Sequence, residues 1–240
     1  GHTFVVEKNI NSMKDISIVI VNYKMKDVLV ACLRSLYRDI AHSPLDISVV
    51  VVDNNSEDGL REVLLREFPA VLCIELDANS GFGAAQNCGM AATEATYYFA
   101  LNPDTDFSSD TNIIDRLYAF MEEHAKVGVI GPKIQYPDGA LQYSCWRFPT
   151  FFQPLFSRTS LGKKGRGQRY AARYFMKEFD HGSTIPVDAV MGSALFVRGT
   201  AVKEVGGFDD KFFMYFEDID WCRRLWEAGW PVYYVHDIVL

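Results

Sequence analysis

The chain lacks three features that would place it in a familiar class: a long hydrophobic run, paired cysteines and an excess of basic residues. Crossing a bilayer takes about 20 consecutive apolar residues, and no run approaches that length. No secretory signal peptide is visible either. With 24 Lys and Arg against 31 Asp and Glu, the net charge is −7. A balance of that sign argues against non-specific nucleic-acid binding.

Cysteine and histidine spacing excludes two further classes. The five cysteines include no Cys-x-x-Cys pair, and the five histidines show no metal-ligand spacing. This argues against a zinc site or a disulfide framework and favours reduced thiols in a cytosolic setting. We therefore expect a cytoplasmic globular protein, and 240 residues suffice for one large or two small domains. Gly1-His2 is typical of a cloning scar and takes no part in the fold prediction.

The first half alternates buried strands with amphipathic helices. Helical spacing of apolar residues begins at Asp27, an expected N-cap, and again at Leu60. The apolar runs that predict strands are Asp15–Val21, Ile47–Val52, Val71–Leu76 and Tyr97–Leu101. Strands and helices in this order predict βαβ units, and so a mostly parallel sheet flanked by helices.

Polar side chains follow three of these strands. Asn22 and Tyr23 follow the first, Asp53 to Asn55 follow the second, and Asn102-Pro103-Asp104-Thr105-Asp106 follows Leu101. In open α/β sheets this carboxyl edge is where ligands bind. Oxygen ligands there suit Mg²⁺ or Mn²⁺ carrying a diphosphate. A plain Asn-Pro-Asp turn is the alternative interpretation of the third group.

A glycine-rich stretch, Asn79–Asn87, follows the third strand. Its glycines allow close backbone approach, and the helix start that follows offers N–H groups to an anion. The Gly81-Phe82-Gly83 triplet also suggests a second hypothesis, that the chain is an NAD-dependent oxidoreductase. Gln86 disfavours this hypothesis, because it stands where the dinucleotide-binding fingerprint has its third glycine.

The second half is less regular. A helix around Ile113–Met121 and a strand over Val127–Ile134 precede a hairpin turn into Leu141–Trp146. A further strand is predicted over Val187–Val197, and a helix from Glu217 ends at Gly229. Between residues 158 and 177 there are seven basic residues and no acid. That segment is either a solvated loop, an electropositive flap over a phosphate-bearing substrate, or a contact with anionic lipid.

Taken in order, these motifs resemble the family 2 glycosyltransferases with the GT-A fold, especially the rhamnosyltransferase-like branch. Each motif alone is weak, but the ordered set is specific and covers nearly the whole chain. The matching stretches are IVIVNY (Ile18–Tyr23), VVDNNSEDG (Val51–Gly59), NSGFGAAQNCG (Asn79–Gly89), LNPDTD (Leu101–Asp106), VGGFDDKFFMYFEDIDWCRRL (Val205–Leu225) and AGW (Ala228–Trp230).

The resemblance implies a Rossmann-like mostly parallel central sheet with a smaller, mixed acceptor-side region. It implies one GT-A domain over residues 15–240, with a nucleotide-sugar half at 15–106 and an acceptor half at 107–240. Residues 1–14 would be a tag remnant and an N-terminal extension.

The resemblance also implies roles for individual residues. Asp53 would accept a hydrogen bond from the base, Asp104 and Asp106 would hold a divalent cation, and Asp218 would be the catalytic base, with Glu217 as the runner-up. We expect neighbouring acids to raise the pKa of Asp218 and the helix dipole to lower it. The remaining residues of the nucleotide-sugar pocket would be Asn22, Tyr23, Asn55, Gly81, Phe82, Gly83, Asn87 and Asn102.

The sequence departs from the family pattern in two places, and both concern the predicted metal site. Asn102 stands where a full Asp-x-Asp motif has its first acid. The family's further metal-ligand histidine follows the final strand, and His236 lies a few residues too early for it. We therefore expect the chain to be a fragment that lacks this ligand and a membrane-proximal segment.

The implied activity is inverting transfer of a sugar from a dTDP- or UDP-sugar, with dTDP-rhamnose as one candidate. The acceptor would be a hydroxyl of a saccharide or lipid-linked molecule in cell-surface polysaccharide synthesis. Mg²⁺ or Mn²⁺ would be the cofactor, nucleic acid would not be a partner, and the inner membrane surface would be a peripheral contact. The alternative is a sugar-nucleotide binding module without turnover.

Overall fold

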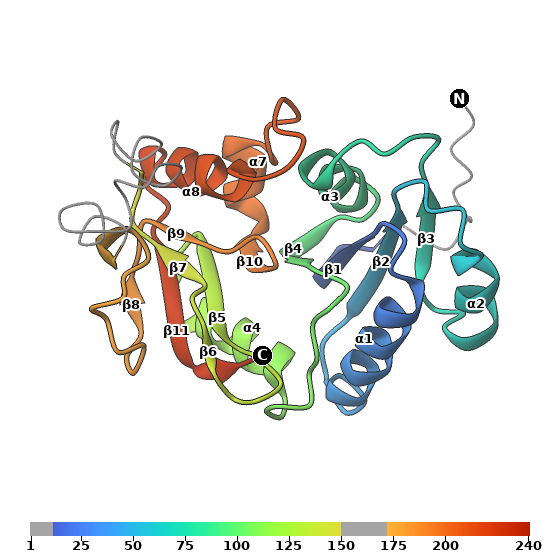
Figure 1. Ribbon diagram of the computed structural model, residues 1–240, viewed down its shortest axis with the longest axis horizontal. Coiled ribbons are helices and arrows are strands. Elements are labelled where there is room, and N and C mark those ends of the chain that lie inside the picture. The colour runs from blue at the N-terminus through green and yellow to red at the C-terminus, as the bar shows by residue number, and fades with distance from the viewer. Residues whose placement is uncertain (1–11, 150–171) are drawn as a thin grey trace, which may run out of the picture.

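The computed structural model describes residues 12–149 and 172–240. One large, mostly parallel sheet runs through the molecule, with helices on both faces (Figure 1). Its strand order is β3-β2-β1-β4-β10-β5-β11-β8, and β6 pairs with β5. The bounds are β1 Lys14–Asn22, β2 Ile47–Asp53, β3 Leu72–Glu75, β4 Ala95–Leu101, β5 Val129–Gln135, β6 Leu141–Gln142, β8 Ile185–Pro186, β10 Ala194–Arg198 and β11 Val232–Val239.

Alternate residues of the strands fill two separate cores. Ile16, Ile18 and Ile20 of β1 point to one face, whereas Val19 and Val21 point to the other. Such runs, apolar on both faces, are typical of a parallel strand covered by helices on each side. The first core is closed by α1 (Lys26–Asp39), α2 (Leu60–Glu67) and α4 (Ile113–Glu123), and the second by α3 (Phe82–Ala91), α7 (Gly199–Val205) and α8 (Glu217–Glu227).

The register of the sheet brings the expected ligand-binding ends together. β1 pairs in parallel with β2 and with β4, so Asn22 lies opposite Asp53 and Ile20 opposite Leu101. β10 runs antiparallel to β4, with Ala194 opposite Leu101. The residues that precede β10 therefore lie at the carboxyl end of β4.

Most of the expected elements are confirmed, with three corrections. Asp27 is not an N-cap: α1 begins at Lys26 after Met25, and Asp27 lies in its first turn. The strand expected over residues 187–197 is two strands, β9 (Ala189–Val190) and β10. Only β10 joins the large sheet, whereas β9 pairs with β7 (Cys145–Trp146) in a second, two-stranded sheet.

The strand expected over residues 141–146 is likewise divided between β6 and β7, which belong to different sheets. The ending of α8 was predicted correctly. Gly229 has φ +85°, and the amides of Gly229 and Trp230 donate to the carbonyls of Trp226 and Leu225, as in a Schellman motif. The first strand begins at Lys14, one residue before the expected domain start.

Part of the basic segment, and residues 1–11 of the expected N-terminal extension, lie outside the described residues. No helix in the described ranges has the length and apolar character needed to cross a membrane.

α3 packs closely against the sheet at Gly89. A Cβ there would lie 2.2 Å from Val19 Cγ1 and 3.0 Å from Val52 Cγ2. We expect Gly89→Ala to lower the free energy of unfolding by about 1–3 kcal/mol through overpacking, despite the better helix propensity of alanine. Urea unfolding followed by circular dichroism measures this.

Val19→Ala is the control, because it removes the methyl group that lies nearest to the added Cβ. In the Val19→Ala background, Gly89→Ala should cost clearly less than in the wild type. An equal loss of unfolding free energy in both backgrounds would mean that the contact between Gly89 and Val19 does not limit how closely α3 packs on β1.

Candidate active site

The site begins at the carboxyl ends of β1 and β2. Asn22, fully buried, donates from Nδ2 to Asp53 Oδ1 at 3.1 Å and to Ser56 Oγ at 2.9 Å. Asn22 and Asp53 therefore emerge side by side at the carboxyl edge of the sheet. This bond leaves the second carboxylate oxygen of Asp53 free of Asn22.

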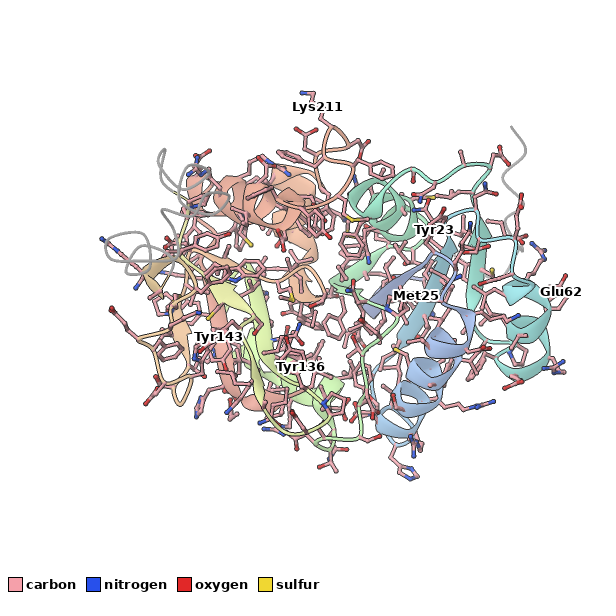
Figure 2. All side chains as sticks on the ribbon, viewed as in Figure 1. Tyr23, Met25, Glu62, Tyr136, Tyr143 and Lys211 are labelled. Carbon is pink, nitrogen blue, oxygen red and sulfur yellow. The ribbon has the colours of Figure 1, made fainter. Side chains whose placement is uncertain are left out.

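A hollow of about 250 Å³ opens beside Asp53. Asn55 lines it and has φ +62°, a left-handed conformation that asparagine adopts more readily than most residues. Arg61 and Glu75 form an ion pair in its wall. Tyr23 is 44% exposed on the same edge, labelled in Figure 2, with Lys24 Nζ 5.3 Å from its ring centroid. A flat ring that meets the Asp53 carboxylate would find space here.

Asn54, which the sequence analysis did not single out, connects this hollow to the glycine-rich stretch. Its Nδ2 donates to Asn79 Oδ1 at 2.9 Å and to the Gly81 carbonyl at 3.2 Å. Its Oδ1 accepts from the Ser80 amide at 2.9 Å. Asn54 is buried, and both its amide oxygen and its amide nitrogen are hydrogen-bonded, so it fixes the position of the glycine-rich stretch relative to the end of β2. The repeated Asn in the VVDNNS stretch was the available signal.

The predicted pocket residues at the start of α3 contact a second loop. Gly81 has φ +85°, and a Cβ there would lie 2.3 Å from the Phe213 carbonyl oxygen. A Cβ on Gly83 would lie 2.9 Å from Phe208 Cβ. The Phe82 amide, expected to be open to an anion, instead donates to the Phe213 carbonyl at 3.3 Å. The two glycines are therefore required for packing whether or not they touch a ligand.

Asn87 fixes the same loop from one turn further along α3. Its Nδ2 donates to the Phe208 carbonyl at 2.8 Å and to Asp210 Oδ1 at 2.7 Å, and its Oδ1 accepts from the Phe208 amide at 2.9 Å. Its amide is thus occupied within the protein. Phe82 also contacts Phe208, with ring centroids 5.8 Å apart.

The turn after β4 carries the predicted metal ligands. Asp104 is exposed and makes no hydrogen bond or ion pair with another described residue. Asp106 Oδ1, in contrast, accepts from the amide and hydroxyl of Ser108, at 3.1 and 2.7 Å. The amide side chain of Asn102 makes no hydrogen bond to another described residue.

The underside of this turn rests on α1. Ser35 Oγ accepts from the Phe107 amide at 3.2 Å. Burial raises the pKa of the Cys32 thiol to about 12, and the nearby carboxylates of Asp104 and Asp106 add to the shift. Cys32 is therefore a neutral core thiol and does not compete with oxygen ligands.

These residues fit a divalent cation that is shared with a substrate. Within the described ranges no three His, Cys, Asp or Glu side chains gather as a metal cluster. Mg²⁺, however, is commonly bound by one or two carboxylates together with substrate phosphates and water. Asp104, unpaired at the carboxyl edge, provides such a carboxylate.

The opposite wall of the site belongs to the second half of the chain. The Asn102 amide donates to the Ser193 carbonyl at 2.8 Å, and the neighbouring Gly192 amide donates to Asp218 Oδ2 at 3.0 Å. Two hydrogen bonds thus link the turn after β4 to the start of α8. A Cβ on Gly192 would lie 3.3 Å from Asp218 Cβ and 3.4 Å from Phe82 Cε1, so the three residues meet.

The two candidate bases differ in their surroundings. Burial raises the pKa of Asp218, and hydrogen bonds from the Gly192 and Ile219 amides partly offset it. Opposing effects of neighbouring acids and the helix dipole were expected to act on this pKa, whereas the main cause of its shift in the structure is burial. Burial also raises the pKa of Glu217, with Asp218 adding, and its Oε2 is buried without a described partner. Asp220 is occupied, because its Oδ2 accepts from Arg224 Nε at 2.8 Å.

Comparisons with known proteins identify the family of the chain. The family model described as "Glycosyl transferase family 2" matches residues 17–179. The N-acetylglucosaminyl-diphospho-decaprenol L-rhamnosyltransferase of Mycobacterium tuberculosis (strain H37Rv) is 32% identical over 200 residues, which cover 79% of this chain and 64% of that protein. Rhamnosyltransferase WbbL of Escherichia coli (strain K12) is 27% identical over 228 residues, 91% of this chain and 79% of that protein.

Solved structures show the same fold at low identity. The mannosyltransferase PcManGT from Pyrobaculum calidifontis, in complex with GDP-Man and Mn²⁺, superposes with a TM-score of 0.64 at 15% identity. It covers 98% of this chain and 58% of that one. Staphylococcus aureus TarS 1-349 in complex with UDP gives 0.60 at 15% identity, over 93% and 58%.

The expected GT-A fold is therefore confirmed. The chain spans somewhat less than two thirds of the length of its mycobacterial relative. The matched region extends over most of the sheet and includes the edge that carries Asn22, Asp53 and Asp104. The chain belongs to glycosyl transferase family 2.

Proposed function

We propose that the chain is the catalytic domain of an inverting glycosyltransferase that uses a dTDP- or UDP-sugar, with dTDP-rhamnose as the first candidate. The acceptor we propose is a hydroxyl of a sugar linked through diphosphate to a polyprenyl lipid. The mycobacterial relative, by its name, acts on an acceptor of that class. The observation that carries the proposal is the Asp218 carboxylate, held by the Gly192 amide beside the edge that presents Asp53 and Asp104.

The proposed reaction is a single displacement. Asp218 accepts the proton of the acceptor hydroxyl while the hydroxyl oxygen bonds to the anomeric carbon of the donor. The bond from that carbon to the diphosphate oxygen breaks, and the nucleoside diphosphate leaves with its electron pair. Attack from the face opposite the leaving group inverts the anomeric centre.

The remaining residues bind and orient the donor. Asp53 accepts from a ring N–H of the base, and Tyr23 lies along the nucleotide. Asn102 would reach the donor sugar with its side-chain amide, which makes no hydrogen bond to another described residue. Asp104, assisted by Asp106, would hold a divalent cation, which offsets the charge that develops on the departing diphosphate.

Asp104 should make nucleotide binding depend on metal. In calorimetry with UDP and with dTDP, Mn²⁺ should tighten binding to the wild type at least about tenfold and leave Asp104→Ala unchanged. Asp138→Ala, in the exposed turn between β5 and β6, is the control and should behave as the wild type. Equal tightening in Asp104→Ala would remove this residue from the metal site.

Asp218→Asn keeps the side chain's shape but removes the base. We expect transfer to fall roughly 10²–10⁴-fold while the Kd of the donor nucleotide stays within about twofold. The assay follows nucleotide release with dTDP-rhamnose and N-acetylglucosaminyl-diphospho-prenol. Transfer at the wild-type rate would pass the role of base to Glu217, whereas lost nucleotide binding would make Asp218 part of the donor site.

The pH profile gives an independent check. A base acts when deprotonated, and burial raises the pKa of Asp218. Transfer should therefore decline, as the pH falls, at a pH above the ordinary aspartate value of about 3.9. An acid limb at or below that value would contradict the assignment.

The buried charge of Glu217 should lower the free energy of unfolding at neutral pH. Its folded-state pKa lies above its unfolded value, so folding favours the protonated form and disfavours the charged one. We expect Glu217→Gln to raise the free energy of unfolding by about 1 kcal/mol at pH 7. This gain should vanish as the pH falls below the unfolded value of about 4.3. Urea unfolding at pH 7 and pH 4 measures it, and a gain that persisted at pH 4 would exclude the charge as its cause.

A further inference from the structure

Four consecutive apolar side chains stand in solvent next to the candidate base. Phe213, Met214, Tyr215 and Phe216 are 56, 54, 73 and 52% exposed. They form the last part of the connection from α7 to α8, and we call them the apolar loop. Lys211, just before them, is labelled at the outer edge of the molecule in Figure 2. Adjacent exposed large hydrophobic residues are typical of an interaction surface, whereas single ones are common.

The loop is held in this position by its backbone. The Phe213 carbonyl accepts from the Phe82 amide at 3.3 Å, and the Phe216 carbonyl accepts from the Asp220 amide at 2.9 Å. Tyr215 and Phe216 both have left-handed backbones, with φ +71° and +70°. Aromatic residues rarely adopt this conformation, and such strain persists only where surrounding contacts enforce it. The exposure is therefore fixed by the fold.

The side chains select among partners. Three of the four, Phe213, Met214 and Phe216, have no hydroxyl or N–H at the tip. A sugar ring needs hydrogen-bond partners for its hydroxyls, but a hydrocarbon does not. The preceding residues, Asp209, Asp210 and Lys211, sum to a negative charge, which does not favour anionic head groups. Apolar and aromatic residues with few charges fit the boundary between head groups and acyl chains.

We propose that the apolar loop inserts into the surface of a lipid bilayer. Phe216 immediately precedes Glu217 and Asp218 in the chain. Insertion would therefore hold the candidate base at the level of the head groups, where the sugar of a lipid-linked acceptor lies. The placement of the base beside the acceptor sugar rests on the function proposed above, whereas the insertion of the loop into the bilayer does not.

Co-flotation with neutral phosphatidylcholine vesicles tests the insertion, in low salt and in about 0.5 M NaCl, where head-group charge is screened. The test variant is Phe213→Ser/Met214→Ser, which leaves the two left-handed residues and the candidate bases intact. The matched control is Leu65→Ser on α2, which removes a side chain that is 58% exposed elsewhere. Calorimetry with dTDP and Mn²⁺ checks that each variant keeps its donor site.

We expect the wild type and Leu65→Ser to bind vesicles equally, at either salt concentration. The double variant should bind at least about tenfold more weakly, with nucleotide affinity unchanged. No binding by the wild type, equal binding by the double variant, or binding that is lost at high salt would each overturn the proposal. So would a change in self-association of the double variant in sedimentation, because the loop would then be an interface between copies of the chain. If vesicle binding holds but the wild type transfers no sugar from dTDP- or UDP-sugars to a lipid-linked acceptor, the insertion stands and the proposed function falls.

Discussion

Antiparallel pairing of β10 with β4 is the constraint on which the rest of the site depends. It carries the chain back to the carboxyl end of β4, where the Ser193 carbonyl accepts from the Asn102 amide. Without that return, the carboxyl edge that carries Asn22, Asp53 and Asp104 would have no group opposite it. With it, the Gly192 amide reaches the Asp218 carboxylate and fixes the start of α8 at the same edge.

The second connection between the halves runs through α3. Asn87 binds the backbone of Phe208, and Gly81 allows the Phe213 carbonyl to approach. These contacts offset part of the conformational free energy of Tyr215 and Phe216, whose left-handed backbones cost about 1–3 kcal/mol each. Burial of two adjacent carboxylates at the start of α8 adds a further cost. Strain and buried charge of this kind are commonly found where structure is retained for function.

Much of the fold could be predicted from sequence because its signals are local. Runs such as Ile47–Val52 and the polar residues that follow each strand predicted the parallel sheet and its ligand-binding edge. Parallel strand direction predicted that Asn22 and Asp53 emerge at the same edge, but the hydrogen bond between them was not predicted. Residues whose roles depend on distant partners could not be predicted. Nothing in the sequence shows that Gly81 faces the Phe213 carbonyl, that Asn87 holds a loop 121 residues away, or that Gly192 binds Asp218. The division of residues 187–197 into β9 and β10 was missed for the same reason. The two strands pair with different sheets, and the sequence of the segment does not show which partner strand lies beside each part.

The central claim is that one edge of the sheet binds the nucleotide and presents it to Asp218. A crystal structure of this chain with dTDP and Mn²⁺ tests it most directly. We predict the base within hydrogen-bond distance of Asp53, the metal bound by Asp104 and the diphosphate, and the terminal phosphate on the side of the site that faces Asp218. A nucleotide bound at another edge of the sheet, or a diphosphate that points away from α8, would contradict the account.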